Sequence, residues 1–214
     1  MSLAVELLVQ RARVGNGTLR QHDVRRLEQG RTLALAVALA PPRLWSYLVD
    51  AALDGFGDGF HRPHDGRMST RMHQGLRVGQ QALRTRVEAL IERRPPDVGL
   101  MALSLEDSVL HVLCAGPMRA YLHRQGTTRR LSAREESDQG MLKLAPSWSA
   151  EQVAPGDLVF VTSVADGQAP GLDAVRAALD EGRPLAPHDV VQQLTEPAAE
   201  RGIGAVAMAY RVPG

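Results

Sequence analysis

The apolar positions in the first forty residues form two runs with the length of β-strands. Residues 3–14 alternate in character and are rich in Val and Leu, and a Gly-Asn-Gly triplet at 15–17 interrupts the pattern. Residues 31–40 (RTLALAVALA) are almost continuously apolar until the Pro41-Pro42 pair. Both patterns predict strands, and the second run is long enough to cross a core.

The next segment of the chain has the spacing of helices. Residues 42–53 place apolar side chains at helical intervals, behind a proline that suits a first helical turn. Residues 68–93 show the same periodicity until Pro95-Pro96, where proline ends the helix. Between them, residues 54–66 (DGFGDGFHRPHDG) are rich in glycine. We therefore predict two helices joined by a glycine-rich loop.

The second half of the chain returns to strand-length runs. Residues 98–105, 109–115 and 118–123 are apolar segments separated by short turns, which is the spacing of an antiparallel meander. The remaining expected elements are weaker strands within 124–145, a buried strand at 157–163, short helices at 171–181 and 187–196, and a closing strand at 203–212.

This order of elements predicts the fold class. Strands come first, then two helices, several strands, two short helices and a final strand. Two antiparallel sheets packed between two helical layers would bury the apolar faces of all these elements. We expect an α+β protein, a four-layer αββα sandwich. Residues 1–214 are expected to form a single domain, because no repeat or low-complexity linker divides the chain.

Composition narrows the function classes. Hydrophobic residues make up 44% of the chain and charged residues 23%, as in a globular protein. The formal net charge of +1 argues against nucleic acid or an acidic membrane as the partner. No aromatic residue interrupts the arginines of residues 71–94, which weakens an RNA-binding interpretation further. Lys143 is the only lysine, and this preference for arginine suggests a GC-rich bacterial genome.

The cysteine content and the N-terminal sequence bear on the compartment. Cys114 is the only cysteine, so no internal disulfide forms, and its apolar neighbours favour a buried side chain over a catalytic thiol. The first residues lack the basic and apolar regions of a signal peptide. No uncharged apolar run reaches about 18 residues, the length of a membrane span. We expect a reduced, cytoplasmic compartment.

Three local patterns coincide with this order of elements. Residues 115–124 read AGPMRAYLHR, residues 155–163 join a Pro-Gly-Asp turn to a hydrophobic strand that ends in Ser, and Gln21-His22-Asp23 precedes the apolar run 35–40. Together these segments resemble the PPM-type (type 2C) metal-dependent serine/threonine protein phosphatases and the related bacterial sporulation and stress-sigma phosphatases. In that family, Gly-Asp-Ser-Arg precedes Ala-Tyr-Leu, Ser-Asp-Gly follows the later strand, and Asp-Gly follows the early one. The resemblance covers nearly the whole chain in order and implies the same sandwich.

The chain departs from the family where the reaction needs metal ligands. The resemblance implies two divalent cations, held by acidic side chains, that activate a bridging water. Leu39-Ala40 stands at the central Asp-Gly, and Arg201-Gly202 stands at the terminal Asp-Asn. Asp166 would serve only if its loop accommodates two extra residues, whereas Asp23 matches cleanly. The vestigial metal-site positions are Asp23, Leu39, Ala40, Asp166, Arg201 and Gly202.

One or two carboxylates cannot hold two dications against their mutual repulsion. We therefore predict a pseudophosphatase with no cofactor and no catalytic residue. It would be a regulatory protein-binding module in phospho-signalling whose partner is a kinase, a phosphoprotein or an anti-sigma-type regulator. The alternative is a divergent active phosphatase, with Mg²⁺ or Mn²⁺ held by Asp23, Asp166 and one of Asp58 and Asp65. A third hypothesis is a structural subunit of a larger assembly.

Other residues are candidates for binding. Arg20, near the place of the family's phosphate-gripping arginine, and Arg119 are candidate contacts for a phosphate or an acidic partner; a surface arginine paired with a carboxylate is the simpler interpretation of Arg119. The segment 54–66 suggests a partner-binding loop if its aromatic side chains are exposed. Its acidic and His residues also suggest a metal site, and a plain helix-connecting loop is the alternative. The loop candidates are Phe56, Asp58, Phe60, His61 and His64.

Overall fold

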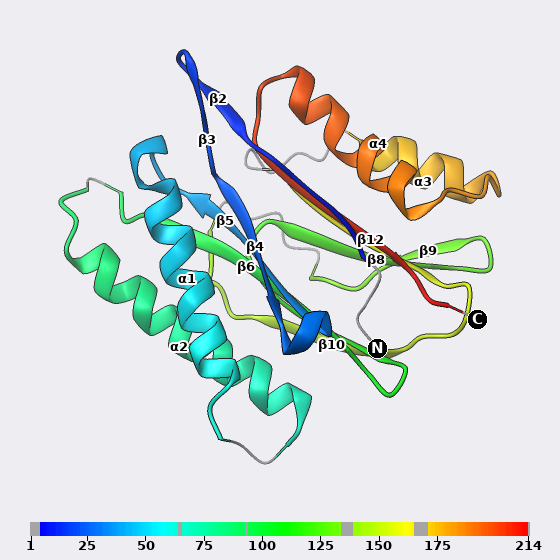
Figure 1. The fold of residues 1–214 in the computed structure, drawn as a ribbon, viewed down its shortest axis with the longest axis horizontal. Coiled ribbons are helices and arrows are strands. Elements are labelled where there is room, and N and C mark those ends of the chain that lie inside the picture. The colour runs from blue at the N-terminus through cyan, green and yellow to red at the C-terminus, as the bar shows by residue number, and fades with distance from the viewer. Residues whose placement is uncertain (1–4, 64–65, 93, 134–138, 165–170, 214) are drawn as a thin grey trace.

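Four layers make up the structure, a computed structural model that describes residues 5–63, 66–92, 94–133, 139–164 and 171–213. Figure 1 shows two sheets between two helical pairs. One pair is α1 (Trp45–Phe60) and α2 (Met68–Glu88), and the other is α3 (Leu172–Asp180) and α4 (Pro187–Glu200). The α+β sandwich of two antiparallel sheets flanked by helices, predicted from the order of elements, is confirmed.

Both sheets are antiparallel. The first has the order β1–β12–β11–β8–β9 and the second the order β10–β7–β6–β5–β4, while β2 and β3 form a separate hairpin. The strands are β1 (Glu6–Gln10), β2 (Ala12–Val14), β3 (Gly17–Leu19), β4 (His22–Leu27), β5 (Thr32–Leu39), β6 (Asp97–Glu106), β7 (Val109–Ala115), β8 (Met118–Arg124), β9 (Thr127–Arg130), β10 (Ser147–Gln152), β11 (Leu158–Val164) and β12 (Ala205–Arg211). Short 3-10 turns cover Glu28–Gly30 and Pro42–Leu44.

Strand β5 shows how the sequence builds the layers. Its residues 33, 35 and 37 lie between the two sheets, and its residues 34, 36 and 38 face α1 and α2. All six are buried, so a polar side chain at any of these six positions would not meet water. A third core, between the first sheet and α3 and α4, contains Phe160, Val175 and Val190. Burial of such side chains stabilises the fold by about 2 kcal/mol each.

Helix α1 is longer than the sequence predicts. The expected loop 54–66 is helical through Phe60, so that loop prediction is wrong for its first half. The glycines there serve helix packing: a Cβ built on Gly59 would lie 2.5 Å from the carbonyl oxygen of Gln74, and one on Gly55 would lie 3.0 Å from the Cα of Gly79. Because glycine lacks a Cβ, α1 and α2 approach each other closely along this line.

The expected three-stranded meander is divided between the two sheets. β6 and β7 pair in the second sheet, but β8 pairs with β11 in the first. The crossing runs through Gly116, whose φ of +129° suits glycine alone, and a Cβ there would lie 2.5 Å from the Cα of Gly99. The expected strand 3–14 is likewise two strands, β1 and β2, separated at Arg11.

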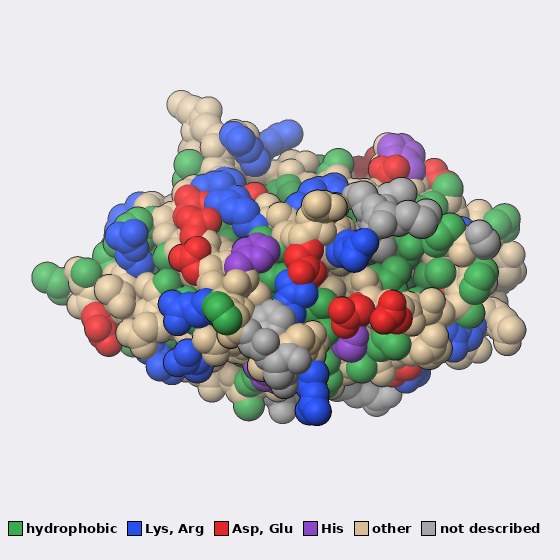
Figure 2. Space-filling view, turned by 60° about the horizontal axis from the view of Figure 1, so that its bottom comes forward, with side chains coloured by type: hydrophobic (Ala, Val, Ile, Leu, Met, Phe, Trp, Pro, Cys, Tyr) green, Lys and Arg blue, Asp and Glu red, His purple; other side chains and the backbone are tan. Residues whose placement is uncertain are grey.

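The surface carries charges of both signs. On the face drawn in Figure 2, acidic and basic side chains are interspersed, in keeping with the net charge of +1. Among the residues that the structure describes, no helix is both long and apolar enough to cross a membrane.

Candidate functional site

The motifs that resemble phosphatase metal-binding segments meet at one end of the sandwich. β5 ends at Leu39, β4 begins at His22 and β12 begins at Ala205. The Nε2 of Gln21 donates a hydrogen bond to the carbonyl oxygen of Ala38 at 3.1 Å. On the other side, a Cβ built on Gly204 would lie 3.0 Å from Nδ1 of His22. We call this region, formed by residues 21–23, 39–40 and 201–204, the β5 end.

The side chain of His22 points between the sheets at this end. His22 is opposite Val37, which lies in the inter-sheet core, and it is fully buried. Neither ring nitrogen has a hydrogen-bond partner among the described residues. Burial lowers the pKa of His22 to about 3, because the apolar surroundings disfavour the imidazolium. His22 is therefore a neutral core residue at physiological pH.

Asp23 faces the opposite way. It pairs with Ala36, whose side chain belongs to the core beneath α1, so Asp23 points toward the helices. Its Oδ2 atom lies 2.6 Å from Nη1 of Arg20 and 3.0 Å from Nη1 of Arg25. Arg20 in turn reaches Asp50 of α1, 2.7 Å away. The candidate carboxylate and the candidate phosphate contact thus hold each other in an ion-pair network between β4 and α1.

Leu39 and Ala40 present aliphatic side chains at the β5 end. Leu39 packs against the inter-sheet core, and the carbonyl oxygen of Ala40 accepts a hydrogen bond from Nε1 of Trp45 at 2.7 Å. Both residues border a pocket of about 570 Å³ whose wall includes Ile91, a fully exposed side chain. The pocket is lined by Leu39, Ala40, Pro41, Ile91, Glu92, Arg94, Pro95 and Pro96.

Arg201 and Gly202 form the turn between α4 and β12. Arg201 is exposed at the end of the helix, and Gly202 has a left-handed φ of +68°. Gly202 donates from its amide to the carbonyl oxygen of Ala199 at 3.0 Å, and its own carbonyl accepts from the amide of Arg13 at 2.8 Å. This is a glycine helix terminus that also anchors the β2–β3 hairpin.

Arg119 lies on the outer face of the first sheet. It is opposite Thr162 on β11, and its alternate neighbour Tyr121 belongs to the core beneath α3 and α4. Its flanking residues Met118 and Ala120 instead belong to the inter-sheet core. The structure therefore places Arg119, half-buried, on the helical side of the sheet and not between the sheets with His22.

The segment predicted as a partner-binding loop has a different role. Phe56 and Phe60 are fully buried in α1, and the guanidinium of Arg71 lies 4.1 Å from the Phe60 ring centroid. The prediction that these aromatic residues form a contact surface is wrong, because they fill the core between the helices and the second sheet. Asp58 and His61 are exposed. His64 and Asp65 lie outside the described residues, as does Asp166.

A buried carboxylate that the sequence did not single out lies beside Leu39. Asp97 is opposite Leu39 on β6 and is 2% exposed. Its carboxylate accepts hydrogen bonds from the amides of Val98, Gly140 and Leu142 at 2.8, 3.0 and 3.1 Å. Burial raises the pKa of Asp97, and the three amides oppose that rise. The only sequence signal is a charged residue at the start of an apolar strand.

The described residues of the β5 end do not fit a pair of divalent cations. Mg²⁺ and Mn²⁺ need several oxygen ligands that converge on one point. Here Leu39 and Ala40 offer no side-chain oxygen, Arg201 is cationic, and Asp23 faces the helices. No group of three or more His, Cys, Asp or Glu side chains within the described parts of the chain is placed to hold a metal ion.

Known proteins share the fold at low sequence identity. No protein-family model matches the chain, and no curated protein matches it either. The Mycobacterium tuberculosis serine/threonine phosphatase PstP/Ppp matches over 100% of both chains, with a TM-score of 0.77 and 14% identity. PppA of Pseudomonas aeruginosa, described as a key regulatory component of T6SS, covers 99% of this chain and 98% of its own at a TM-score of 0.75 and 16% identity.

A third solved structure is the catalytic domain of PstP in complex with two manganese ions. It matches over 98% of each chain, with a TM-score of 0.73 and 18% identity. Identities this low establish the fold alone. The chain has the fold of the PPM-type serine/threonine phosphatases, as the sequence patterns predict.

Proposed function

We propose that this chain is a pseudophosphatase: a non-catalytic, regulatory protein-binding module with the PPM-type phosphatase fold, acting in phospho-signalling. The observation that carries the proposal is how the carboxylate of Asp23 is held. This residue matches a family position, yet its carboxylate is held by Arg20 and Arg25 on the helical face of β4. A carboxylate shared by two guanidiniums is a poor ligand for a cation.

The geometry of β4 makes it costly to turn the Asp23 side chain from the helices to the space between the sheets. Successive residues of a strand point to opposite faces, so Asp23 reaches the inter-sheet side only if β4 shifts by one residue. That shift would turn the buried His22 outward and break both arginine contacts. Six paired residues between β4 and β5 hold the observed register.

The pocket at Leu39 and Ala40 supports protein binding in place of catalysis. Ile91 is fully exposed, and aliphatic and proline side chains surround it. In this proposal, Ile91 and the aliphatic and proline side chains beside it form one apolar surface on which the partner packs. The partner class, a kinase, a phosphoprotein or an anti-sigma-type regulator, rests on the analogy of fold and is part of the proposal.

The first test is catalytic. Purified protein is incubated with Mn²⁺ and a serine-phosphorylated peptide, and phosphate release and thermal unfolding are followed. We expect no turnover and no stabilisation by the metal, since a bound cation would raise the melting temperature. Manganese-dependent turnover that is lost in Asp166→Ala, and kept in the matched surface variant Asp173→Ala, would establish the alternative, a divergent active phosphatase.

The second test concerns the partner surface. The protein is used as bait in an extract of its native cells, with Ile91→Asp and Leu8→Asp as paired variants. Leu8 is 38% exposed on β1, away from the pocket. We expect capture of a partner by the wild type and the Leu8 variant and its loss with the Ile91 variant. Equal capture by both variants would show that the pocket is not the contact surface.

A further inference from the structure

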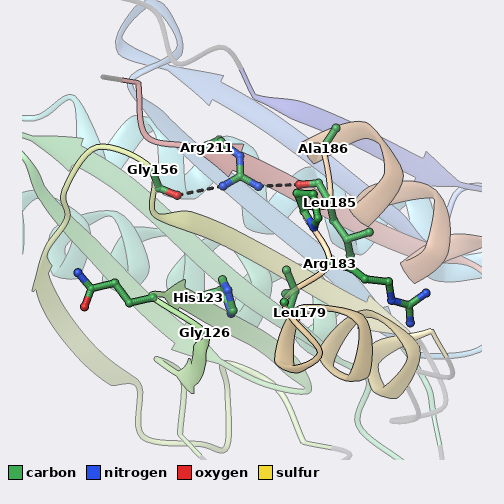
Figure 3. Close-up of a pocket in the computed structure, with 11 residues that line it drawn as sticks. His123, Gly126, Gly156, Leu179, Arg183, Leu185, Ala186 and Arg211 are labelled. Atoms are coloured by element: carbon green, nitrogen blue, oxygen red, sulfur yellow. Dashed lines mark hydrogen bonds between the residues drawn. The ribbon is translucent and has the colours of Figure 1, made fainter.

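A second pocket lies at the opposite end of the sandwich, where β8 and β12 end and β11 begins. It has a volume of about 560 Å³. Three turns build it: the β8–β9 turn at Gly126, the turn before β11 at Gly156, and the α3–α4 connection (Figure 3). We call it the Arg211 pocket. Its volume falls in the range of small-molecule sites, roughly 300–1,000 Å³.

Arg211 provides a fixed positive charge in this pocket. Its Nη1 donates to the carbonyl oxygen of Gly156 at 3.0 Å, and its Nη2 donates to that of Leu185 at 2.6 Å (Figure 3). Both acceptors are neutral, and no carboxylate of the described residues forms an ion pair with Arg211. A guanidinium has five N–H donors, so three remain after these two bonds. The charge is held in position without being neutralised.

His123 lies across the pocket from Arg211 (Figure 3). Its Nδ1 is 2.9 Å from Oγ1 of Thr128, which fixes the ring and leaves Nε2 for another contact. Burial lowers the pKa of His123, and the positive charge of Arg211 also lowers it, while Asp180 and Asp157 raise it. The carboxylate of Asp157 is itself held by Arg124 at 2.5 Å.

The rest of the pocket is largely apolar. Leu179 is buried and Leu185 is half-buried, and both line it. Ala186, the residue before α4, also lines the pocket, so the positive end of that helix dipole lies beside it. Arg183 contributes less, because its guanidinium pairs with Glu181 at 3.0 Å and points away from His123 and Arg211 (Figure 3).

We propose that the Arg211 pocket binds a small organic oxyanion, a carboxylate or a phosphate monoester on a compact apolar body. Arg211 contacts the oxyanion, Nε2 of His123 contacts it from the opposite wall, and Leu179 and Leu185 pack against the apolar body. The pocket is at the end of the sandwich remote from Leu39 and Asp23, so this inference does not depend on the proposed function.

The test compares anionic probes with and without an apolar body, and a cation built on the same aromatic ring. Binding of benzoate, phenyl phosphate, inorganic phosphate and benzamidine to the full chain is measured by amide chemical shifts and calorimetry. We expect benzoate or phenyl phosphate to bind, inorganic phosphate to bind more weakly for want of an apolar body, and the cation benzamidine not to bind. The ratio of the first two affinities identifies the carboxylate or the phosphate as the preferred group.

Variants locate the site. Arg211→Gln is expected to weaken binding about tenfold or more through loss of a charge-assisted bond, and Arg211→Lys to retain part of the affinity. Arg176→Gln, on the exposed side of α3, is the control and should bind like the wild type. His123→Gln provides an independent test if the Arg211 variant fails to fold. Failure of both benzoate and phenyl phosphate to bind, equal binding of benzamidine, or unchanged affinity in the folded pocket variants would overturn the proposal.

Discussion

Strands β8, β11 and β12 run between the two ends of the sandwich, but the charged residues at the two ends have different surroundings. At the β5 end, Asp23 and Arg20 neutralise each other, and the aliphatic side chains of Leu39 and Ala40 line the neighbouring pocket. At the other end, Arg211 is held by two carbonyl oxygens and keeps its charge facing a pocket. A charged residue is therefore available for binding when its surroundings fix it in place without pairing it.

The largest expected effect is on stability at Asp97, where a substitution tests how strongly the stability of the β5 end depends on buried polar groups. Asp97→Ala leaves the amides of Val98, Gly140 and Leu142 without their acceptor in a buried place. We expect a loss of about 3 kcal/mol in the free energy of unfolding, measured by urea denaturation. The control at the other end is Asp180→Ala, which removes an exposed carboxylate and should change stability little. Equal losses of stability in the two variants would show that the two ends do not differ in this way.

The second effect is on the pH dependence of stability, to which the buried His22 contributes. The pKa of His22 is about 3 in the folded protein, below its ordinary value of 6.5, so the unfolded chain takes up the proton first. Stability therefore falls as the pH drops below about 6.5, and His22 accounts for about 2 kcal/mol of that loss at pH 5. We expect His22→Leu to flatten the pH dependence of the free energy of unfolding.

The matched control for that measurement is His188→Leu, an exposed histidine at the start of α4. It should leave the pH dependence as in the wild type. The pKa values of His111 and His123 are also lowered by burial, and they contribute equally to the wild type and to both variants. The same slope in His22→Leu and in the wild type would show that His22 is not the buried group that we infer.

The smallest expected effect concerns the stability contribution of the ion pairs at the two ends of the sandwich. Asp23→Asn breaks the contacts with Arg20 and Arg25, and we expect a loss of about 1 kcal/mol at low salt, because the Asp23 side chain is 17% exposed. The loss should shrink as NaCl is added. At the other end, Glu181→Gln breaks a pair whose side chains are 63% and 64% exposed, and it should have no measurable effect. A salt-independent loss at Asp23 would contradict the electrostatic explanation.

Much of the fold is predictable because the strongest apolar runs are the central strands. The runs at 31–40 and 157–163 correspond to β5 and β11, which are buried on both faces. β4 was missed because Asp23, Arg25 and Arg26 interrupt its apolar pattern, and these residues lie at the sheet edge against α1 or solvent. β10 was missed for a similar reason, since most of its side chains are only partly buried.

The candidate site was predictable in position but not in orientation. The motifs at Asp23, Leu39 and Gly202 do converge at one end of the sandwich. Which face of β4 carries Asp23 depends on strand register, and the sequence does not reveal the register of an edge strand. The Arg211 pocket left no sequence signal, because its three turns lie far apart in the chain. Helical glycines at 55 and 59 likewise read as a loop until α2 is packed against them.

Strands β8, β11 and β12 have seven residues each, which sets the distance between the two ends. A strand of that length spans about 20 Å. A protein seated on Ile91 and a small anion held by Arg211 would therefore not touch, and neither would exclude the other sterically. If both sites are occupied, each ligand would stabilise the folded chain by an amount set by its own concentration and affinity, so the molecule would respond to two ligands independently.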